Sequence, residues 1–242
     1  MVTPLTYRPM DKIVAFLKGI HLNDNREWYL EHRLEYSYAF NTNAQYIQQM
    51  AKMIGEYDIN IRYLRLSDCS YALARHRKIK INKRLFNDYI GGFFARCGKH
   101  SGYAGYYYQL TPEPSDSGGS QLAVGIFNPS REVLDWFRRD AEKNGARIME
   151  LIEKSGFEIL TRDKFVRLPS GYAIDEEYRD LLLMRHIMLV KRVDVKWFYH
   201  EQWMERTVRA FRRCKPFIDH INAIIDEHKI AGLATKKSNN LE

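Results

Sequence analysis

The sequence predicts an α+β fold with a largely antiparallel sheet, an N-terminal helical layer and a long C-terminal helix. Segments with apolar residues at helical spacing lie at both ends of the chain, and alternating or aromatic-rich segments gather between about residues 60 and 127. The strand-like segments have connections of hairpin length and do not alternate strictly with helices. This order disfavours a doubly wound parallel sheet.

The N-terminal part of the chain reads as helical. Asp11–Gly19 is expected to form a short helix that ends at its glycine. A long helix should follow from about Asn25 to Gly55, with Asn23 or Asp24 as its N-cap. From Asn60 the pattern changes to period two. Strands are predicted in four segments: Tyr63–Leu66, Tyr71–Ile81, Phe86–Arg96 and Gly105–Thr111.

The Pro-, Gly- and Ser-rich stretch 111–120 is either a domain linker or a hairpin loop, and the strand pattern of Leu122–Phe127 after it favours the loop. Pro129 and Ser130 then open a helix of about 25 residues. The remaining expected elements are a strand pair at Phe157–Leu168, a helix from 175 to about His186, a strand at Ile187–Val193 and a helix at about His200–His228. Pro216 should kink or split that last helix.

The chain has 242 residues, of which 45% are hydrophobic, and this suits a globular protein. We expect a single α+β domain over residues 1–235 and a disordered tail at 236–242, in which Leu241 and Glu242 resemble a tag remnant. The longest apolar runs have four residues, whereas a membrane span needs about 20. The N-terminus has no apolar signal-peptide stretch. We therefore expect a cytoplasmic protein without a membrane partner.

The positive charge of the chain is concentrated in one segment. The sequence holds 38 Lys and Arg against 30 Asp and Glu, a net charge of +8. Residues 75–84, RHRKIKINKR, contain six of the basic residues and no acidic one, so the rest of the chain has a net charge of only +2. A nearly neutral protein with one basic segment indicates a local anion site or a solvated strand, rather than a general nucleic-acid-binding surface.

Common chemical signatures are absent from the sequence. It contains no GxGxxG or GxxxxGK[ST] phosphate loop, no GxSxG nucleophile elbow and no HExxH zinc motif. The three cysteines, Cys69, Cys97 and Cys214, form no CxxC pair, and buried structural thiols are expected. We therefore expect no metal and no cofactor.

Six short strings spread along the chain carry a family resemblance. They are FLKGIHLNDNREWY (16–29), DCSY (68–71), GYYYQLTP (105–112), LAVGIFNP (122–129), FVRLPSGY (165–172) and CKPFIDHINAIID (214–226). In order and spacing they resemble the bacterial family named domain of unknown function 2461. The resemblance covers nearly the whole chain, and it implies a fold and a motif but no reaction.

The signature of that family, RxxRDxRFxxx[DN]KxxY, aligns with the basic segment. The family residue is kept at Arg75, Asn82 and Lys83, and a similar one stands at Lys78, Ile79 and Phe86. Ala72 replaces an arginine and His76 replaces the aspartate. The carboxylate is lost, and lysine in place of arginine loses the bidentate fork. The site is therefore either degenerate or adapted to a more anionic ligand.

Three functions are open at this stage. The favoured one is a non-enzymatic binding protein whose basic strand binds a small anionic or phosphate-bearing ligand, with nucleic acid as a less favoured partner. Its candidate ligand-binding residues are Arg75, His76, Lys78, Asn82 and Lys83. The second is an enzyme in which His76 is a general acid or base and Arg75 and Lys83 stabilise negative charge. The third is a purely structural, solvent-facing strand, with the function elsewhere.

Overall fold

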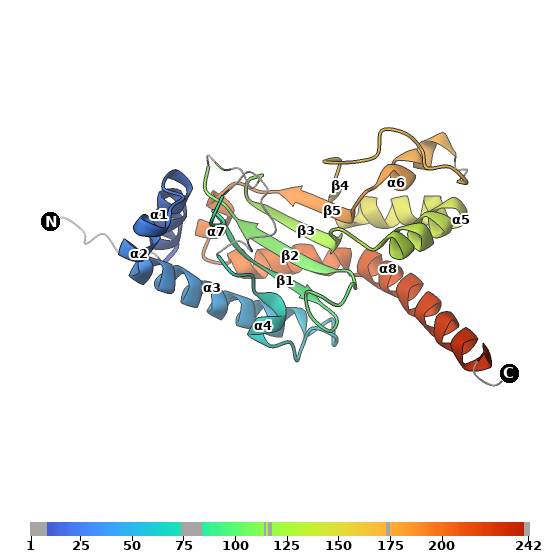
Figure 1. Ribbon diagram of the computed structural model, residues 1–242, viewed down its shortest axis with the longest axis horizontal. Coiled ribbons are helices and arrows are strands. Elements are labelled where there is room, and N and C mark those ends of the chain that lie inside the picture. The colour runs from blue at the N-terminus through green and yellow to red at the C-terminus, as the bar shows by residue number, and fades with distance from the viewer. Residues whose placement is uncertain (1–8, 74–83, 114, 116–117, 173–174, 240–242) are drawn as a thin grey trace. The chain divides into compact units, whose positions relative to one another are not determined.

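The structure is a computed structural model that describes residues 9–73, 84–113, 115, 118–172 and 175–239 (Figure 1). These residues form a five-stranded antiparallel sheet with the strand order β1-β2-β3-β5-β4. The strands are β1 (Ile90–Ala95), β2 (Gly105–Leu110), β3 (Gln121–Ile126), β4 (Glu158–Ile159) and β5 (Ile187–Arg192). The predicted α+β class, with N-terminal helices and a long C-terminal helix, is confirmed.

The helices are α1 (Pro9–Leu22), α2 (Arg26–Glu31), α3 (Arg33–Ile54), α4 (Leu66–Cys69), α5 (Arg131–Ser155), the 3-10 helix η1 (Glu176–Tyr178), α6 (Arg179–Leu183), α7 (Lys196–Tyr199) and α8 (Trp203–Asn239). Local sequence explains the ends of α5. The Ser130 Oγ accepts a hydrogen bond from the Val133 N–H, and Gly156 ends the helix in the left-handed region at φ 69°. None of the helices in the described part of the chain is long and apolar enough to cross a membrane.

The chain divides into two compact units, which we describe separately. Unit 1 comprises Met1–Phe94, Tyr107–Leu122 and Arg192–Val208. Unit 2 comprises Ala95–Tyr106, Ala123–Lys191 and Arg209–Glu242. The single domain over residues 1–235, with a tail after it, stays a prediction.

In unit 1, α3 packs against the strands through a buried polar contact and close backbone approach. The Tyr108 hydroxyl donates to the Asn43 Oδ1 at 2.7 Å, and the Asn43 amide donates to the Gly91 carbonyl at 3.1 Å. Both side chains are buried, so each satisfies the other's hydrogen-bonding groups. The rings of Phe198 and Trp203 pack on Tyr108 and complete an aromatic core.

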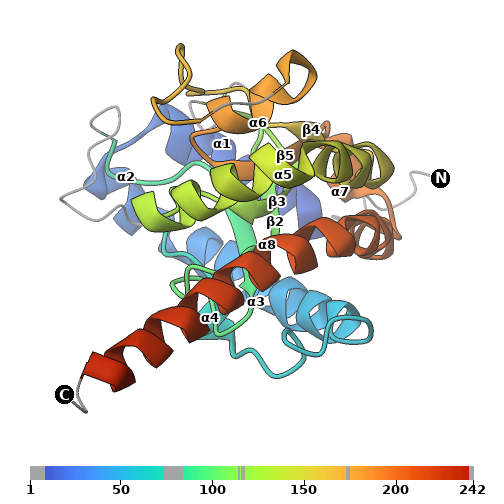
Figure 2. The same cartoon turned by 90° about the vertical axis from the view of Figure 1, so that its right-hand side faces the viewer.

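In unit 2, α5 packs against α8 (Figure 2). The His220 Nε2 lies 2.7 Å from the Asp140 Oδ2, and the rings of Trp136 and His228 stack with centroids 4.7 Å apart. The buried guanidinium of Arg138 donates to the carbonyls of Leu182 and Met184 at 3.1 and 3.3 Å. Arg138 thus satisfies carbonyls that the end of α6 leaves without helical partners.

The helix predicted over residues 25–55 is two helices, α2 and α3. His32 interrupts it with φ −105° and ψ 25°, and its ring stacks on Trp28. The N-cap of α2 is Asn25, whose Oδ1 accepts from the Trp28 N–H at 2.8 Å, and not Asn23 or Asp24. Helix α1 continues past Gly19 to Leu22. A Cβ at Gly19 would lie 2.4 Å from the Trp28 ring, so this glycine makes room for the tryptophan.

Several strand predictions are wrong. Tyr63–Leu66 is a turn that leads into α4, where the Arg65 N–H donates to the Asp68 carboxylate at 2.9 Å. Tyr71–Leu73 is not a strand, and the rest of the predicted strand, residues 74–81, lies outside the described residues. From Phe157 to Leu168 only β4 forms, paired antiparallel with β5.

Other predicted elements are confirmed with changed bounds. β1, β2, β3 and β5 lie within or next to their predicted ranges, and stretch 111–120 connects β2 and β3, which are neighbours in the sheet. The helix expected from residue 175 is shorter and consists of η1 and α6. Helix α8 contains Pro216 and is one helix from Trp203 to Asn239, so the predicted split at this proline is wrong.

A substitution at Gly91 tests how closely the backbones of β1 and β2 approach each other. A Cβ there would lie 2.3 Å from the Tyr108 carbonyl oxygen, so a strand must shift. We expect Gly91→Ala to lower the free energy of urea unfolding by about 3 kcal/mol or to prevent folding. Gly102→Ala is the control, because its Cβ meets nothing within 4 Å and its φ of 77° costs only about 1 kcal/mol. Equal losses in the two variants would contradict this account of the packing.

Candidate functional site

The five residues that the sequence nominates, Arg75, His76, Lys78, Asn82 and Lys83, all lie within 74–83, outside the described residues. What the structure does describe is how the chain enters this segment at Leu73 and leaves it at Arg84. The site is therefore built from the residues that hold these two ends.

Asn87 joins the two ends of the segment. Its backbone N–H donates to the Leu73 carbonyl at 2.8 Å, and its side-chain amide donates to the Ala72 carbonyl at 3.1 Å. Residues separated by more than ten positions along the chain are thereby held side by side. The segment starts and finishes at one place in unit 1.

Arg84 fixes the second end to helix α1. Its Nη2 donates to the Ile20 carbonyl at 3.2 Å and to the His21 carbonyl at 2.8 Å. Carbonyls in the last turn of a helix lack helical partners and lie at the negative end of the helix dipole, so a guanidinium stabilises them. One of the six basic residues of the run thus has a structural role.

Asp24 and Phe86 add two further contacts at the same end. The Asp24 carboxylate accepts hydrogen bonds from the Leu85 and Phe86 N–H groups at 2.8 and 2.9 Å. The Phe86 ring is buried and stacks on Tyr29 with centroids 4.9 Å apart. Phe86 is therefore a packing residue of the signature, and Asp24, expected as a helix cap, instead binds this distant backbone.

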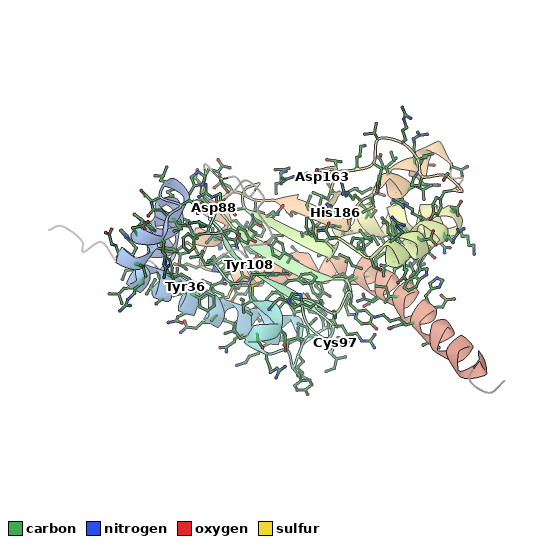
Figure 3. The ribbon with its side chains drawn as sticks, in the orientation of Figure 1. Tyr36, Asp88, Cys97, Tyr108, Asp163 and His186 are labelled. Atoms are coloured by element: carbon green, nitrogen blue, oxygen red, sulfur yellow. The ribbon has the colours of Figure 1, made fainter. Side chains whose placement is uncertain are left out.

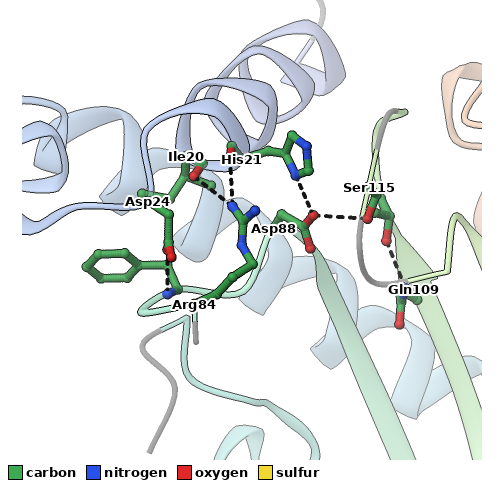
Figure 4. Close-up of polar contacts among 9 residues, drawn as sticks. Ile20, His21, Asp24, Arg84, Asp88, Gln109 and Ser115 are labelled. Carbon is green, nitrogen blue, oxygen red and sulfur yellow. Dashed lines mark hydrogen bonds and ion pairs between the residues drawn. The ribbon is translucent and has the colours of Figure 1, made fainter. Parts of the chain in front are cut away.

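A buried carboxylate lies directly after these anchors. Asp88 is 0% exposed, and its Oδ2 lies 2.9 Å from the His21 Nδ1 and 3.0 Å from the Ser115 Oγ (Figures 3 and 4). When Asp88 is ionised, its carboxylate only accepts hydrogen bonds, and His21 then donates from Nδ1. If the ring is neutral, its Nε2 is then a hydrogen-bond and proton acceptor.

A small cavity of about 20 Å³ lies next to Leu73, with Phe16, Asn43 and Tyr71 in its lining. It has room for about one water molecule. Partial burial, together with the neighbouring Tyr89 and Cys69, raises the pKa of Tyr71 to about 12. Tyr71 is therefore a neutral phenol at ordinary pH and cannot act as a base.

Sequence reasoning missed four residues that the structure brings together: His21, Asp24, Asp88 and Ser115. His21 and Asp24 belong to the family-like string at 16–29, which was a signal for this place in the chain but not for its contacts. His21 and Asp88 are 67 positions apart, and no local spacing connects them.

Among the described residues, the cysteines and the potential metal ligands do not form a further functional centre. Cys69 and Cys214 are buried as predicted, whereas Cys97 is exposed, at a left-handed turn position with φ 61°. Burial raises the pKa of the Cys214 thiol to about 12. Across the described ranges, no three His, Cys, Asp or Glu side chains gather as a metal site would require.

His186 in unit 2 is buried, whereas His21 is only half-buried, and its environment is different (Figure 3). Its Nδ1 accepts from the Asn128 N–H at 3.1 Å, and its ring stacks on Phe127 at 4.2 Å. Burial lowers the pKa of His186 despite the nearby charge of Asp163. In the folded protein its neutral form, with the proton on Nε2, is therefore favoured.

This burial makes stability depend on pH. The unfolded chain takes up a proton at His186 at a higher pH than the folded chain does. The stabilising contribution is thus complete above about pH 6.5 and declines as the pH falls below it. We expect His186→Gln to reduce the loss of unfolding free energy between pH 7 and 5, measured by urea unfolding. His100→Gln, at an exposed position, is the matched control. Parallel losses in the native protein and His186→Gln would contradict a buried neutral imidazole.

Comparison with known proteins gives one match. The family model described as "Conserved hypothetical protein (DUF2461)" matches residues 12–220. No curated protein and no solved structure matches the chain. The match covers most of the sequence, including all the anchors of the basic segment described above. The chain belongs to the family of domain of unknown function 2461.

Proposed function

We propose that this protein is a cytoplasmic binding protein that takes a small anionic, phosphate- or carboxylate-bearing ligand on residues 75–83. The observation that carries the proposal is the fixing of both ends of this cationic segment at one place. Asn87 bonds to Ala72 and Leu73, and Arg84 bonds to the end of α1.

The fixed ends limit how far the positive charges can separate. Ten residues, 74–83, lie between Leu73 and Arg84, and five of them are basic. The bond from Asn87 to Leu73 closes a loop of 14 steps along the chain, and such a loop can reach at most about 25 Å from its closure. Five like charges confined to this range repel one another, and a bound anion relieves the repulsion.

The charge of the remaining chain supports a small ligand rather than nucleic acid. Outside residues 75–84 the net charge is only +2, and Arg84 is already engaged by helix carbonyls. Nucleic-acid binding depends on many phosphate contacts over an extended surface. A compact anion with one or two charged groups matches a short cationic segment better.

Charge reversal tests the proposal. We expect the native protein to bind inorganic pyrophosphate in isothermal titration calorimetry at low ionic strength, with an affinity that falls as salt is added. The double variant Lys78→Glu/Lys83→Glu should weaken binding by about 100-fold, because two attractive charges become repulsive.

The matched control reverses two exposed lysines outside the segment, Lys52→Glu and Lys143→Glu, and so changes the net charge equally. Equal weakening in both double variants would show a general charge effect. Salt-independent binding, or native affinity in Lys78→Glu/Lys83→Glu, would leave the segment as a structural element.

The His21–Asp88 contact favours a second candidate, an enzyme that hydrolyses the bound ester. For a bound phosphate monoester, Asp88 orients the imidazole so that the His21 Nε2 can take a proton from water, whose oxygen then bonds to phosphorus. The bond from phosphorus to the alcohol oxygen breaks, and the imidazolium returns the proton to that oxygen, so the products are the alcohol and inorganic phosphate. The base adjoins the cationic segment, because Arg84 donates to the backbone carbonyl of His21 itself. His21 here takes the role that sequence reasoning gave to His76.

Substitutions of His21 and of His76 show which of these two histidines is the general base. With p-nitrophenyl phosphate as the probe, His21→Gln should lower kcat by about 100-fold or more, while His76→Gln should leave most of the activity. The reverse order of effects would assign the base to His76. A native protein that binds pyrophosphate without turnover would be a binding protein only.

A further inference from the structure

Unit 1 contains a second cavity, of about 170 Å³, that the preceding functions do not use. Its walls come from α1, residues 111–113, Ser120, and the stretch from Val193 to α7. Drug-sized ligands and nucleotides occupy pockets of about 300–1,000 Å³, and a cavity of about 150 Å³ holds benzene. The volume therefore fits a ligand of about six to nine non-hydrogen atoms.

The floor of this cavity is held by hydrogen bonds. The Thr111 N–H donates to the Ser120 Oγ, and the Ser120 hydroxyl donates to the Thr111 carbonyl, both at 2.9 Å. The Gln109 amide donates to the Thr111 Oγ1 at 2.8 Å, and the Val193 N–H donates to the Ser120 carbonyl at 3.1 Å. These contacts within the protein hold the cavity wall in place, as a preformed binding site requires.

The lining contains charged residues of both signs. Lys18 lies on α1, and Glu113 and Asp194 lie on the connecting segments. Among the described residues, the side chains of Lys18 and Glu113 have no hydrogen-bond or ion-pair partner. Asp194 accepts the Lys196 N–H at 2.7 Å with one carboxylate oxygen. One basic and two acidic residues thus line the same cavity, and no ion pair among these three is described.

Besides the charged residues and the hydrogen-bonded Thr111 and Ser120, the lining contains Pro112, Tyr199 and three aliphatic side chains, Val14, Val193 and Val195. We propose that this cavity binds a free α-amino acid with a short aliphatic side chain. The ligand carboxylate pairs with Lys18, its ammonium group pairs with Glu113 and Asp194, and its side chain packs on the valines. Valine has eight non-hydrogen atoms and matches the volume. The proposal does not depend on residues 75–83.

Calorimetry with L-valine and two analogues tests the ligand class. We expect L-valine to bind, and isobutylamine, which lacks the carboxylate, and isovalerate, which lacks the ammonium group, to bind at least about tenfold more weakly, since each loses a charge-assisted pair. Equal binding of all three would show that the cavity recognises only the aliphatic group and would overturn the proposal. No heat with L-valine or L-leucine at millimolar concentration would overturn it too.

Substitutions locate the site. Lys18→Gln and Glu113→Gln should each weaken L-valine binding about tenfold or more, and both positions are exposed, so the fold should be kept. Lys52→Gln, on α3 of the same unit, is the control and should bind like the native protein. Lys78→Glu/Lys83→Glu should also leave L-valine binding unchanged, which separates this site from the anion site. Native affinity in both Lys18→Gln and Glu113→Gln would place the ligand elsewhere and overturn the proposal.

Discussion

The buried carboxylate of Asp88 is the constraint on which the candidate site depends. A carboxylate without water must be hydrogen-bonded, because an unpaired buried charge costs several kcal/mol. Asp88 finds described donors in His21 on α1 and Ser115 in the 111–120 connection, while it belongs itself to the chain just before β1. One buried charge therefore brings together three segments that are far apart in the sequence.

Helix α1, which contacts Asp88 through His21, also contributes to both proposed ligand sites. Its last turn supplies the carbonyls that hold Arg84, and Val14 and Lys18, four residues apart on one helical face, line the 170 Å³ cavity. A helix moves as a unit, so a shift of α1 at His21 would also shift the cavity wall. The two proposed sites hence share a support although they recognise different groups.

Local signals made part of the fold predictable. The Ser130 cap and Gly156 end of α5 depend on neighbours in the sequence, and so do the alternating patterns of β2 and β3. Long-range packing decided the rest. Gly19 looked like a helix end because its role, accommodating Trp28, is visible only in three dimensions. Likewise the sequence reveals the positive charge of residues 75–84. It does not reveal the contacts of His21, Asp24 and Asp88 near this segment, because no regular sequence spacing relates these residues to it.

Arg84 shows that not every basic residue of the segment 75–84 is available to bind a ligand. Its guanidinium stabilises the end of α1 as Arg138 stabilises the end of α6, so an arginine in a charged string can be a helix cap rather than a ligand-binding group. The remaining five basic residues of the run lie outside the described residues. The Leu73–Asn87 bond has a loop-closure cost, and it limits how far these five like charges can separate. In the proposed anion site this cost is offset on binding, because the cations are held near one another before the ligand arrives.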